Sequence, residues 1–283
     1  FTTPTIGGLI EDYDRLLWHQ ELPFNSTSIY AQWDVMKAAH NAGIKVLLDG
    51  QGADEVGCGY YTYGGVYVLT KLLSLNILSA LYHTYALSKN TNRMMVKYVL
   101  AAVAEHFGIR NIGSRQIGKS TDRYLNDDGR SLNSGAPVRR WGSTILDHSL
   151  KNIQYGLQQL LRYEDRNSMA FSIEARVPFL DHRFVEHVLA MQPSQKIAQG
   201  YLKYFLRSGM NADLPNSIAW QKGKTGFVTP QRQWRAMLPE ESFQRSIGGL
   251  ERIGMIRIEE QIARRVLDNL SAAEESEFWR MQS

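Results

Sequence analysis

Apolar residues recur every three or four positions through much of the chain, which is typical of amphipathic helices. Between residues 28 and 42 these positions are Ile29, Trp33, Met36 and Ala39. The same spacing predicts further helices over about 66–88, 93–107, 143–167, 182–191 and 257–270. The pattern therefore predicts a protein built largely from helices, with residues 108–140 as a polar excursion between two of them.

A short apolar run from Ile44 to Leu48 predicts a buried strand directly after the first of these helices. Gly43 separates the two, at the position where a helix commonly ends in a left-handed residue. One strand cannot form a sheet, so we expect its neighbours to be short strands or strands upstream of Phe1. The sequence thus predicts a helix-rich α/β fold.

The segment that follows the predicted strand, residues 49–60, is rich in glycine and in carboxylates, among them Asp49, Asp54 and Glu55. Glycine allows a backbone to approach a ligand closely, and open α/β sheets bind ligands beyond the carboxyl ends of their strands. Backbone N–H groups in such a loop can bind an anion, and an adjacent carboxylate can hold Mg²⁺ against a phosphate. We therefore predict a nucleotide or phosphate site here rather than a simple exposed turn.

Two further segments carry charged residues in unusual settings. Glu174 and Arg176 alternate with apolar residues, so in an extended segment they point to the same side. From the residues alone a structural salt bridge is the favoured interpretation of this pair. Lys222 and Lys224 lie in a glycine-containing loop that can approach a phosphate, but without P-loop spacing a solvated basic turn is the favoured interpretation.

Composition narrows the class of protein only modestly. The chain has 283 residues, of which 43% are hydrophobic and 21% charged, with a net charge of +4 spread along its length. This small excess does not predict nucleic-acid binding, and no apolar run approaches the ~20 residues of a membrane span. Cys58 is the single cysteine, which excludes an internal disulfide and predicts a reducing, cytoplasmic setting. Because the sequence opens at Phe1 without a methionine, we expect a fragment or a processed product.

Several segments resemble, in the same order and at similar separations, the synthetase domain of glutamine-hydrolysing asparagine synthetases. The resemblance covers about residues 25–235, within a single domain spanning 1–283. The matching segments are Asp49-Gly50-Gln51-Gly52-Ala53-Asp54-Glu55 with Gly59-Tyr60, Ser168-Met169-Ala170 with Glu174–Asp181, Lys203–Arg207, Leu214-Pro215 and Lys224–Pro230. The resemblance implies part of an adenine-nucleotide alpha-hydrolase-like domain of the PP-loop ATP pyrophosphatase kind.

The resemblance also implies a reaction. In the family, ATP adenylates a carboxylate, which is aspartate in asparagine synthetases, and ammonia derived from glutamine attacks the acyl-adenylate to give the amide. The implied cofactors are ATP and Mg²⁺. The implied partners are a small carboxylate substrate, a glutaminase domain absent from this chain and, in a homodimer, a second copy.

Individual roles follow from the same resemblance. Asp54 matches the carboxylate that binds Mg²⁺-pyrophosphate, Lys224 the lysine that stabilises charge during acyl transfer, and Glu174 a carboxylate of the acyl-transfer pocket. Gln51 occupies a catalytic position as well. The predicted nucleotide-binding positions are Gly50, Gln51, Gly52 and Arg176.

Two departures from the family pattern bear on function. Gln51 stands where asparagine synthetases usually carry a glutamate, and an amide cannot act as a general base. The sequence also lacks the family's S-G-G-x-D-S loop, so we expect this chain alone to be inactive. The alternatives are therefore an enzyme that amidates another carboxylate or closes a lactam, and a noncatalytic module for nucleotide binding or assembly.

Overall fold

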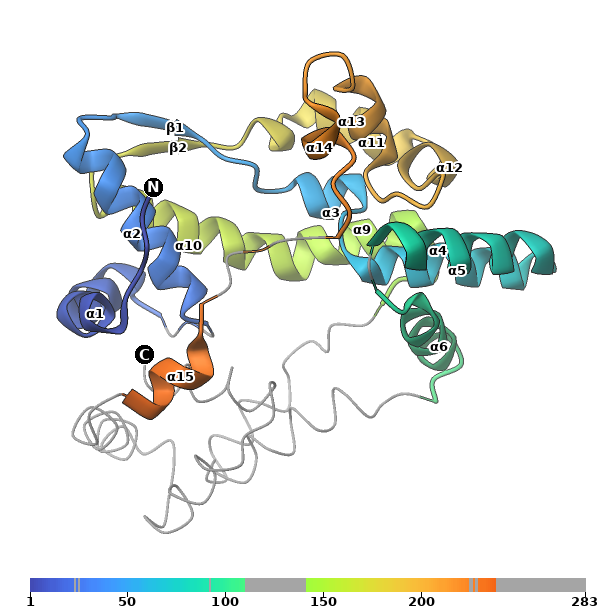
Figure 1. The fold of residues 1–283 in the computed structure, drawn as a ribbon, viewed down its shortest axis with the longest axis horizontal. Coiled ribbons are helices and arrows are strands. Elements are labelled where there is room, and N and C mark those ends of the chain that lie inside the picture. The colour runs from blue at the N-terminus through green and yellow to red at the C-terminus, as the bar shows by residue number, and fades with distance from the viewer. Residues whose placement is uncertain are drawn as a thin grey trace, which may run out of the picture.

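The computed structural model describes residues 1–22, 24, 26–91, 93–109, 141–223, 226 and 229–237. Helices dominate this part of the chain, around one small parallel sheet (Figure 1). The α-helices are α1 (Ile6–Gln20), α2 (Ser28–Asn41), α3 (Ala53–Gly57), α4 (Tyr61–Leu73), α5 (Ile77–Thr91), α6 (Met95–His106), α9 (Ile145–Asn152), α10 (Gln158–Met169), α11 (His182–Ala190), α12 (Pro193–Lys196), α13 (Tyr204–Gly209), α14 (Asn216–Ala219) and α15 (Gln231–Met237). The remaining elements are the strands β1 (Val46–Leu48) and β2 (Glu174–Arg176), the π-helical turn η1 (Ile153–Leu157) and the 3-10 turn η2 (Pro178–Leu180).

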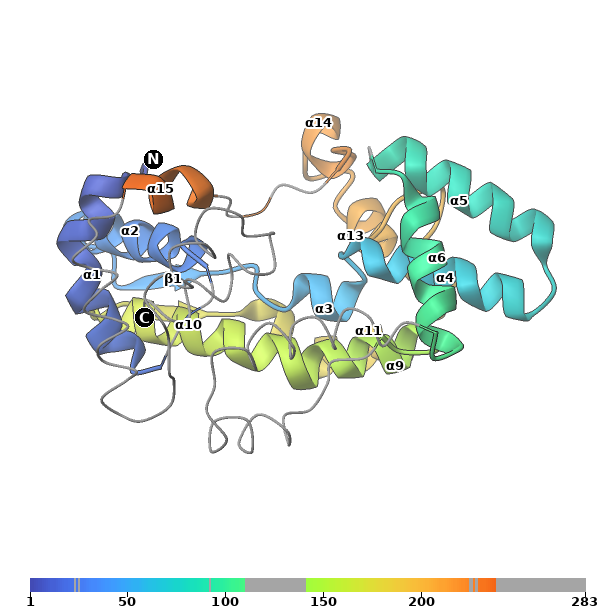
Figure 2. The ribbon, with the colours of Figure 1, turned by 90° about the horizontal axis from the view of Figure 1, so that it is seen from below.

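A long helical rod made of α9, η1 and α10 connects two hydrophobic cores (Figures 1 and 2). At one end, α1 and α2 pack on α10 around Trp33, which is fully buried and meets Phe171 edge to face at 4.6 Å between ring centroids. At the other end, α4, α5 and α6 pack with α9 around Tyr63 and Met95. The sheet lies beside α2 and α10 at the first core, and α3 lies between the two cores (Figures 1 and 2).

The sheet has two parallel strands, with Val46 opposite Glu174 and Leu48 opposite Arg176. Leu47 packs toward the core formed with α2 and α10. By contrast, Val46 is 45% exposed and Leu48 is 75% exposed. The prediction of a buried strand was therefore wrong for one face, because the described helices cover only the face that carries Leu47.

Most predicted helices are present, with one instructive error. The structure confirms the helices predicted over 28–42, 93–107 and 182–191, and it forms 143–167 as α9, η1 and α10. The single helix predicted over 66–88 is instead the hairpin of α4 and α5. Leu75 takes a left-handed conformation with φ 58°, and the Asn76 side chain accepts a hydrogen bond from the Ser79 N–H, which starts the second helix. The helix predicted over 257–270 and most of the polar connecting segment 108–140 lie outside the described residues.

Candidate functional site

The loop after β1 is shaped by a turn that begins at Asp49. The Asp49 N–H donates to the Arg176 carbonyl at 2.8 Å, which extends the pairing of the two strands by one residue. The Asp49 side chain then accepts the Gln51 N–H at 3.0 Å, an arrangement that reverses the chain locally. Gly50 and Gln51 therefore lie at the same end of the sheet as Arg176, whereas Glu174 is paired with Val46 at the other end.

Gly52 is one position in this loop where a side chain does not fit. Its φ is 87°, in the region that favours glycine, and a Cβ placed there would lie 2.2 Å from Leu180 Cδ2. Leu180 belongs to η2, which follows β2 directly. The close contact fixes the glycine-rich loop against the segment that contains Glu174 and Arg176.

Asp54 lies in the first turn of α3 and forms an ion pair with Lys203, at 2.9 Å between Oδ1 and Nζ. Both side chains are largely shielded, at 22% and 28% exposure. A Cβ at Gly59 would lie 1.7 Å from Asp54 Oδ1, so this glycine makes room for the carboxylate. The pair brings a carboxylate and an ammonium from distant parts of the sequence to one point.

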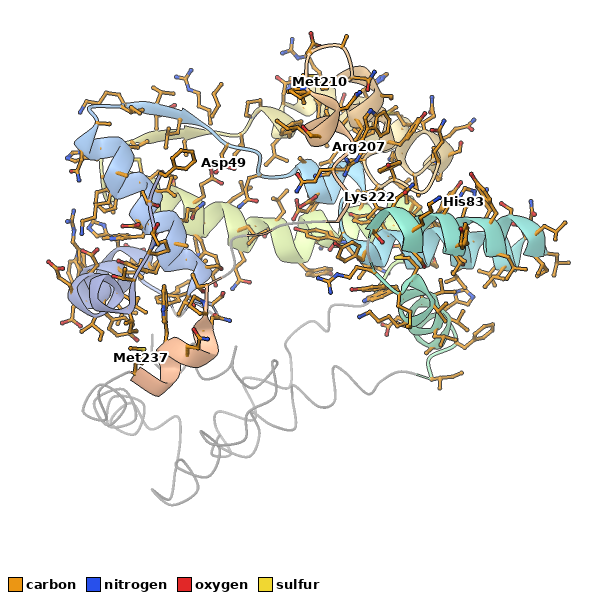
Figure 3. The ribbon with its side chains drawn as sticks, viewed as in Figure 1. Asp49, His83, Arg207, Met210, Lys222 and Met237 are labelled. Atoms are coloured by element: carbon orange, nitrogen blue, oxygen red, sulfur yellow. The ribbon has the colours of Figure 1, made fainter. Side chains whose placement is uncertain are left out.

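A cavity of about 560 Å³ opens beside this ion pair. Its wall combines polar groups near the pair with apolar side chains from η2, α13 and α14, and it includes Asp54, Tyr61, Asn90, Phe179, Lys203 and Leu206. Figure 3 shows Arg207, Met210 and Lys222 on the same side of the molecule. A cavity that joins an apolar wall to a few converging polar groups is typical of small-molecule sites.

The segment that leads to Lys224 reaches this cavity. Arg207 donates to the carbonyls of Ala219 at 2.7 Å and Gln221 at 3.2 Å, which anchors the segment to α13. Gly223 lines the cavity, and its N–H donates to the Asn90 carbonyl at 3.3 Å. Lys224 itself, which the resemblance places in the catalytic machinery, lies outside the described residues.

Glu174 and Arg176 form an ion pair on β2, at 3.3 Å between Oε1 and Nε. They point to one side, as the alternation in the sequence predicts. Their side chains are 61% and 63% exposed, so the pair is not buried among its apolar neighbours as the salt-bridge interpretation assumed. The exposed face holding this pair also carries Val46 and Leu48, since these residues are paired in register.

One buried acid lies beneath the loop. Glu164 of α10 is 2% exposed, and burial together with the adjacent Asp49 carboxylate raises the pKa of Glu164 to about 8. Because two neighbouring carboxyl groups cannot both ionise readily, Glu164 holds a proton at neutral pH. Figure 3 shows Asp49 between the strand pair and α10.

Lys203 and Glu164 are the residues to which sequence reasoning assigned no role. Lys203 was visible as the first residue of a matching segment, but only the structure shows its contact with Asp54. Among the described residues, no group of three His, Cys, Asp or Glu side chains could hold a metal ion. Asp54 suits Mg²⁺ nonetheless, because this ion is usually bound by one or two carboxylates together with phosphate oxygens and water.

Comparisons with known proteins identify the family. The family model described as asparagine synthase matches residues 5–283, so this chain belongs to the asparagine synthase family. Its relatives include a protein named amidase chyE from Penicillium rubens, 24% identical over 80% of this chain and 38% of the relative. Asparagine synthetase [glutamine-hydrolyzing] 2 from Bacillus subtilis is 28% identical over 73% of this chain and 25% of the relative. The chain thus spans well under half the length of these relatives. In the part of the chain that the structure describes, no helix is long and apolar enough to cross a membrane.

Proposed function

We propose that this chain is the synthetase part of an ATP-dependent amidotransferase with a PP-loop ATP pyrophosphatase fold. The observation that carries the proposal is the Asp54–Lys203 pair, which lies beside the cavity and next to the glycine-rich loop in a member of the asparagine synthase family. A carboxylate and an ammonium at one point match the two needs of a magnesium pyrophosphate group, a metal ligand and a counter-charge. Lys224, which follows the cavity-lining Gly223, would add a second positive charge.

In the first half-reaction, a carboxylate oxygen of the acceptor attacks the α-phosphorus of ATP. The bond from that phosphorus to the β-phosphate oxygen breaks, and pyrophosphate leaves with the electron pair. Asp54 would hold Mg²⁺ on the departing pyrophosphate while Lys203 and Lys224 neutralise its charge. The N–H groups of Gly50 to Gly52 would face the nucleotide, and Glu174 with Arg176 would line the acceptor side.

In the second half-reaction, ammonia attacks the acyl carbon and AMP leaves. The relatives named asparagine synthetase [glutamine-hydrolyzing] support glutamine as the source of that ammonia, through a glutaminase domain outside this chain. We further propose that the acceptor is a carboxylate other than aspartate, because Gln51 replaces the family's glutamate. Two relatives carry the name amidase, in keeping with an acceptor outside asparagine synthesis.

Exchange of labelled pyrophosphate into ATP tests this proposal even while the amide product is unidentified. The full-length gene product is incubated with ATP, Mg²⁺ and a panel of carboxylic acids, with aspartate included and a reaction without acid as control. Exchange that depends on one acid identifies the acceptor. Absence of exchange with every acid, in a protein that binds ATP, would favour the noncatalytic module instead.

A further inference from the structure

The buried carboxyl of Glu164 has no role in the first half-reaction, although it lies directly below the glycine-rich loop of residues 49–60. It is almost completely shielded from solvent at 2% exposure, and neither of its oxygens receives a hydrogen bond from an N–H or O–H group of the described residues. A buried carboxyl in such a setting is costly unless it is protonated or functional. Its neighbour is Asp49, whose side chain also accepts the Gln51 N–H.

The other charged side chains around α10 that have defined contacts are engaged elsewhere. Three of them form ion pairs with residues other than Glu164 or Asp49, namely Lys37 with Asp12, Arg166 with Glu21, and Arg176 with Glu174. Two others donate to carbonyl groups, Arg162 to that of Gln20 and Arg15 to that of Ala170. No cation of these pairs neutralises the two acids. Asp49 and Glu164 therefore interact mainly with each other, as two carboxyl groups that share one proton.

Asp49 is two residues before Gln51 and remains half-exposed, while Glu164 is buried beneath it. This places an acid–base pair next to the position where the family carries a glutamate. An amide at Gln51 cannot take a proton from an ammonium ion, yet an amine must lose that proton before it can attack. A base is needed near this point, and the Asp49 side chain is held there by its contact with the Gln51 N–H.

We propose that Asp49, which lies above the buried Glu164, accepts the proton of the ammonium nucleophile in place of the base lost at Gln51. This inference rests on the proposed function. Glu164 already holds a proton at neutral pH, so the ammonium ion gives one proton to the carboxylate of Asp49. The resulting ammonia forms a bond to the acyl carbon, the bond from that carbon to the adenylate oxygen breaks, and AMP leaves. The second nitrogen proton passes to solvent.

The test compares D49N with the wild type in the full-length gene product. Asparagine at this position keeps the shape of aspartate and can still accept the Gln51 N–H, but it cannot take up a proton. D165N alters an exposed acid of α10 next to Glu164 and serves as the matched control. The measurements are acid-dependent pyrophosphate exchange and amide formation, with either ammonium or hydroxylamine as the nucleophile.

Hydroxylamine is neutral at pH 7 and needs no deprotonation before it attacks. We expect D49N to exchange pyrophosphate like the wild type and to react with hydroxylamine at a similar rate. With ammonium its rate should fall by about 10²-fold or more, the usual effect of losing a general base. Equal losses with both nucleophiles would show a structural role only, and an unchanged rate with ammonium would equally overturn the proposal.

A spectroscopic measurement tests whether Glu164 and Asp49 share a proton at pH 7, even if no acceptor acid is found. The infrared difference spectrum between wild type and E164Q at pH 7 should contain the band of a protonated carboxyl group, which should be absent from the difference between wild type and D165N. Absence of this band in the first spectrum would refute the shared proton. Absence of exchange in the wild type with every acid would instead count against the proposed function.

Discussion

The burial of Glu164 makes a quantitative prediction about how stability depends on pH. The pKa of this carboxyl rises from 4.5 to about 8, first because it is desolvated and second because Asp49 is adjacent. Between these two values the folded protein binds a proton that the unfolded chain has released. The free energy of unfolding should therefore fall as the pH rises through this window.

The magnitude follows from the size of the shift. Each pKa unit corresponds to about 1.4 kcal/mol, which sets an upper limit of about 5 kcal/mol for the whole window. Relaxation around the buried group reduces this value, so between pH 5 and pH 8.5 we expect the wild type to lose about 2–4 kcal/mol of stability relative to E164Q. Glutamine is neutral throughout, so the variant lacks this loss.

Urea denaturation at pH 5, 7 and 8.5 measures the effect in wild type, E164Q and the control D165N. The stability of E164Q minus that of the wild type should increase steadily with pH, whereas D165N should follow the wild type. D49N should move the window to lower pH, because it removes the neighbouring charge while leaving the burial. A difference between E164Q and wild type that stays constant from pH 5 to 8.5 would refute the reasoning.

Three further predictions concern single positions. G52A should destabilise the fold by about 1–3 kcal/mol in urea denaturation, because a Cβ would collide with Leu180 at a positive φ; wild-type stability in this variant would contradict the structure of the loop. L75G should stabilise the fold by up to about 1 kcal/mol, since Leu75 is 84% exposed and left-handed, and a loss of stability would count against that conformation. Q51E should not confer aspartate-dependent asparagine formation on the full-length gene product, because we expect the acceptor pocket to take another acid; product analysis that finds asparagine would show that only the base had been lost.

The fold was predictable where the pattern of apolar residues is local. Residues 28–48 illustrate this, since one helix, a glycine and an apolar strand follow each other in sequence and in the structure. The second strand was not predictable from the pattern of apolar residues, because Glu174-Ala175-Arg176 is short and exposes two charged side chains. The hairpin of α4 and α5 was missed because the apolar spacing continues through Leu75, and only the backbone at that residue reveals the break.

The candidate site was likewise predictable from the sequence only in part. The loop from Asp49 to Glu55 stands out in the sequence by its composition alone. Its contacts with Lys203 and Glu164 depend on tertiary packing between distant segments, and no local pattern encodes them. Sequence reasoning can therefore identify the motif, whereas the counter-charge and the buried acid become visible only in the structure.

The central claim is that Asp54 and Lys203 hold the pyrophosphate of ATP during adenylation of a carboxylate. The most direct measurement is acid-dependent pyrophosphate exchange by the full-length gene product and by D54N, with exposed Asp165→Asn as the control. We predict exchange in the wild type and the control, and a loss of about 10²-fold or more in D54N that higher Mg²⁺ restores only in part. Exchange in D54N at the wild-type rate would contradict the account.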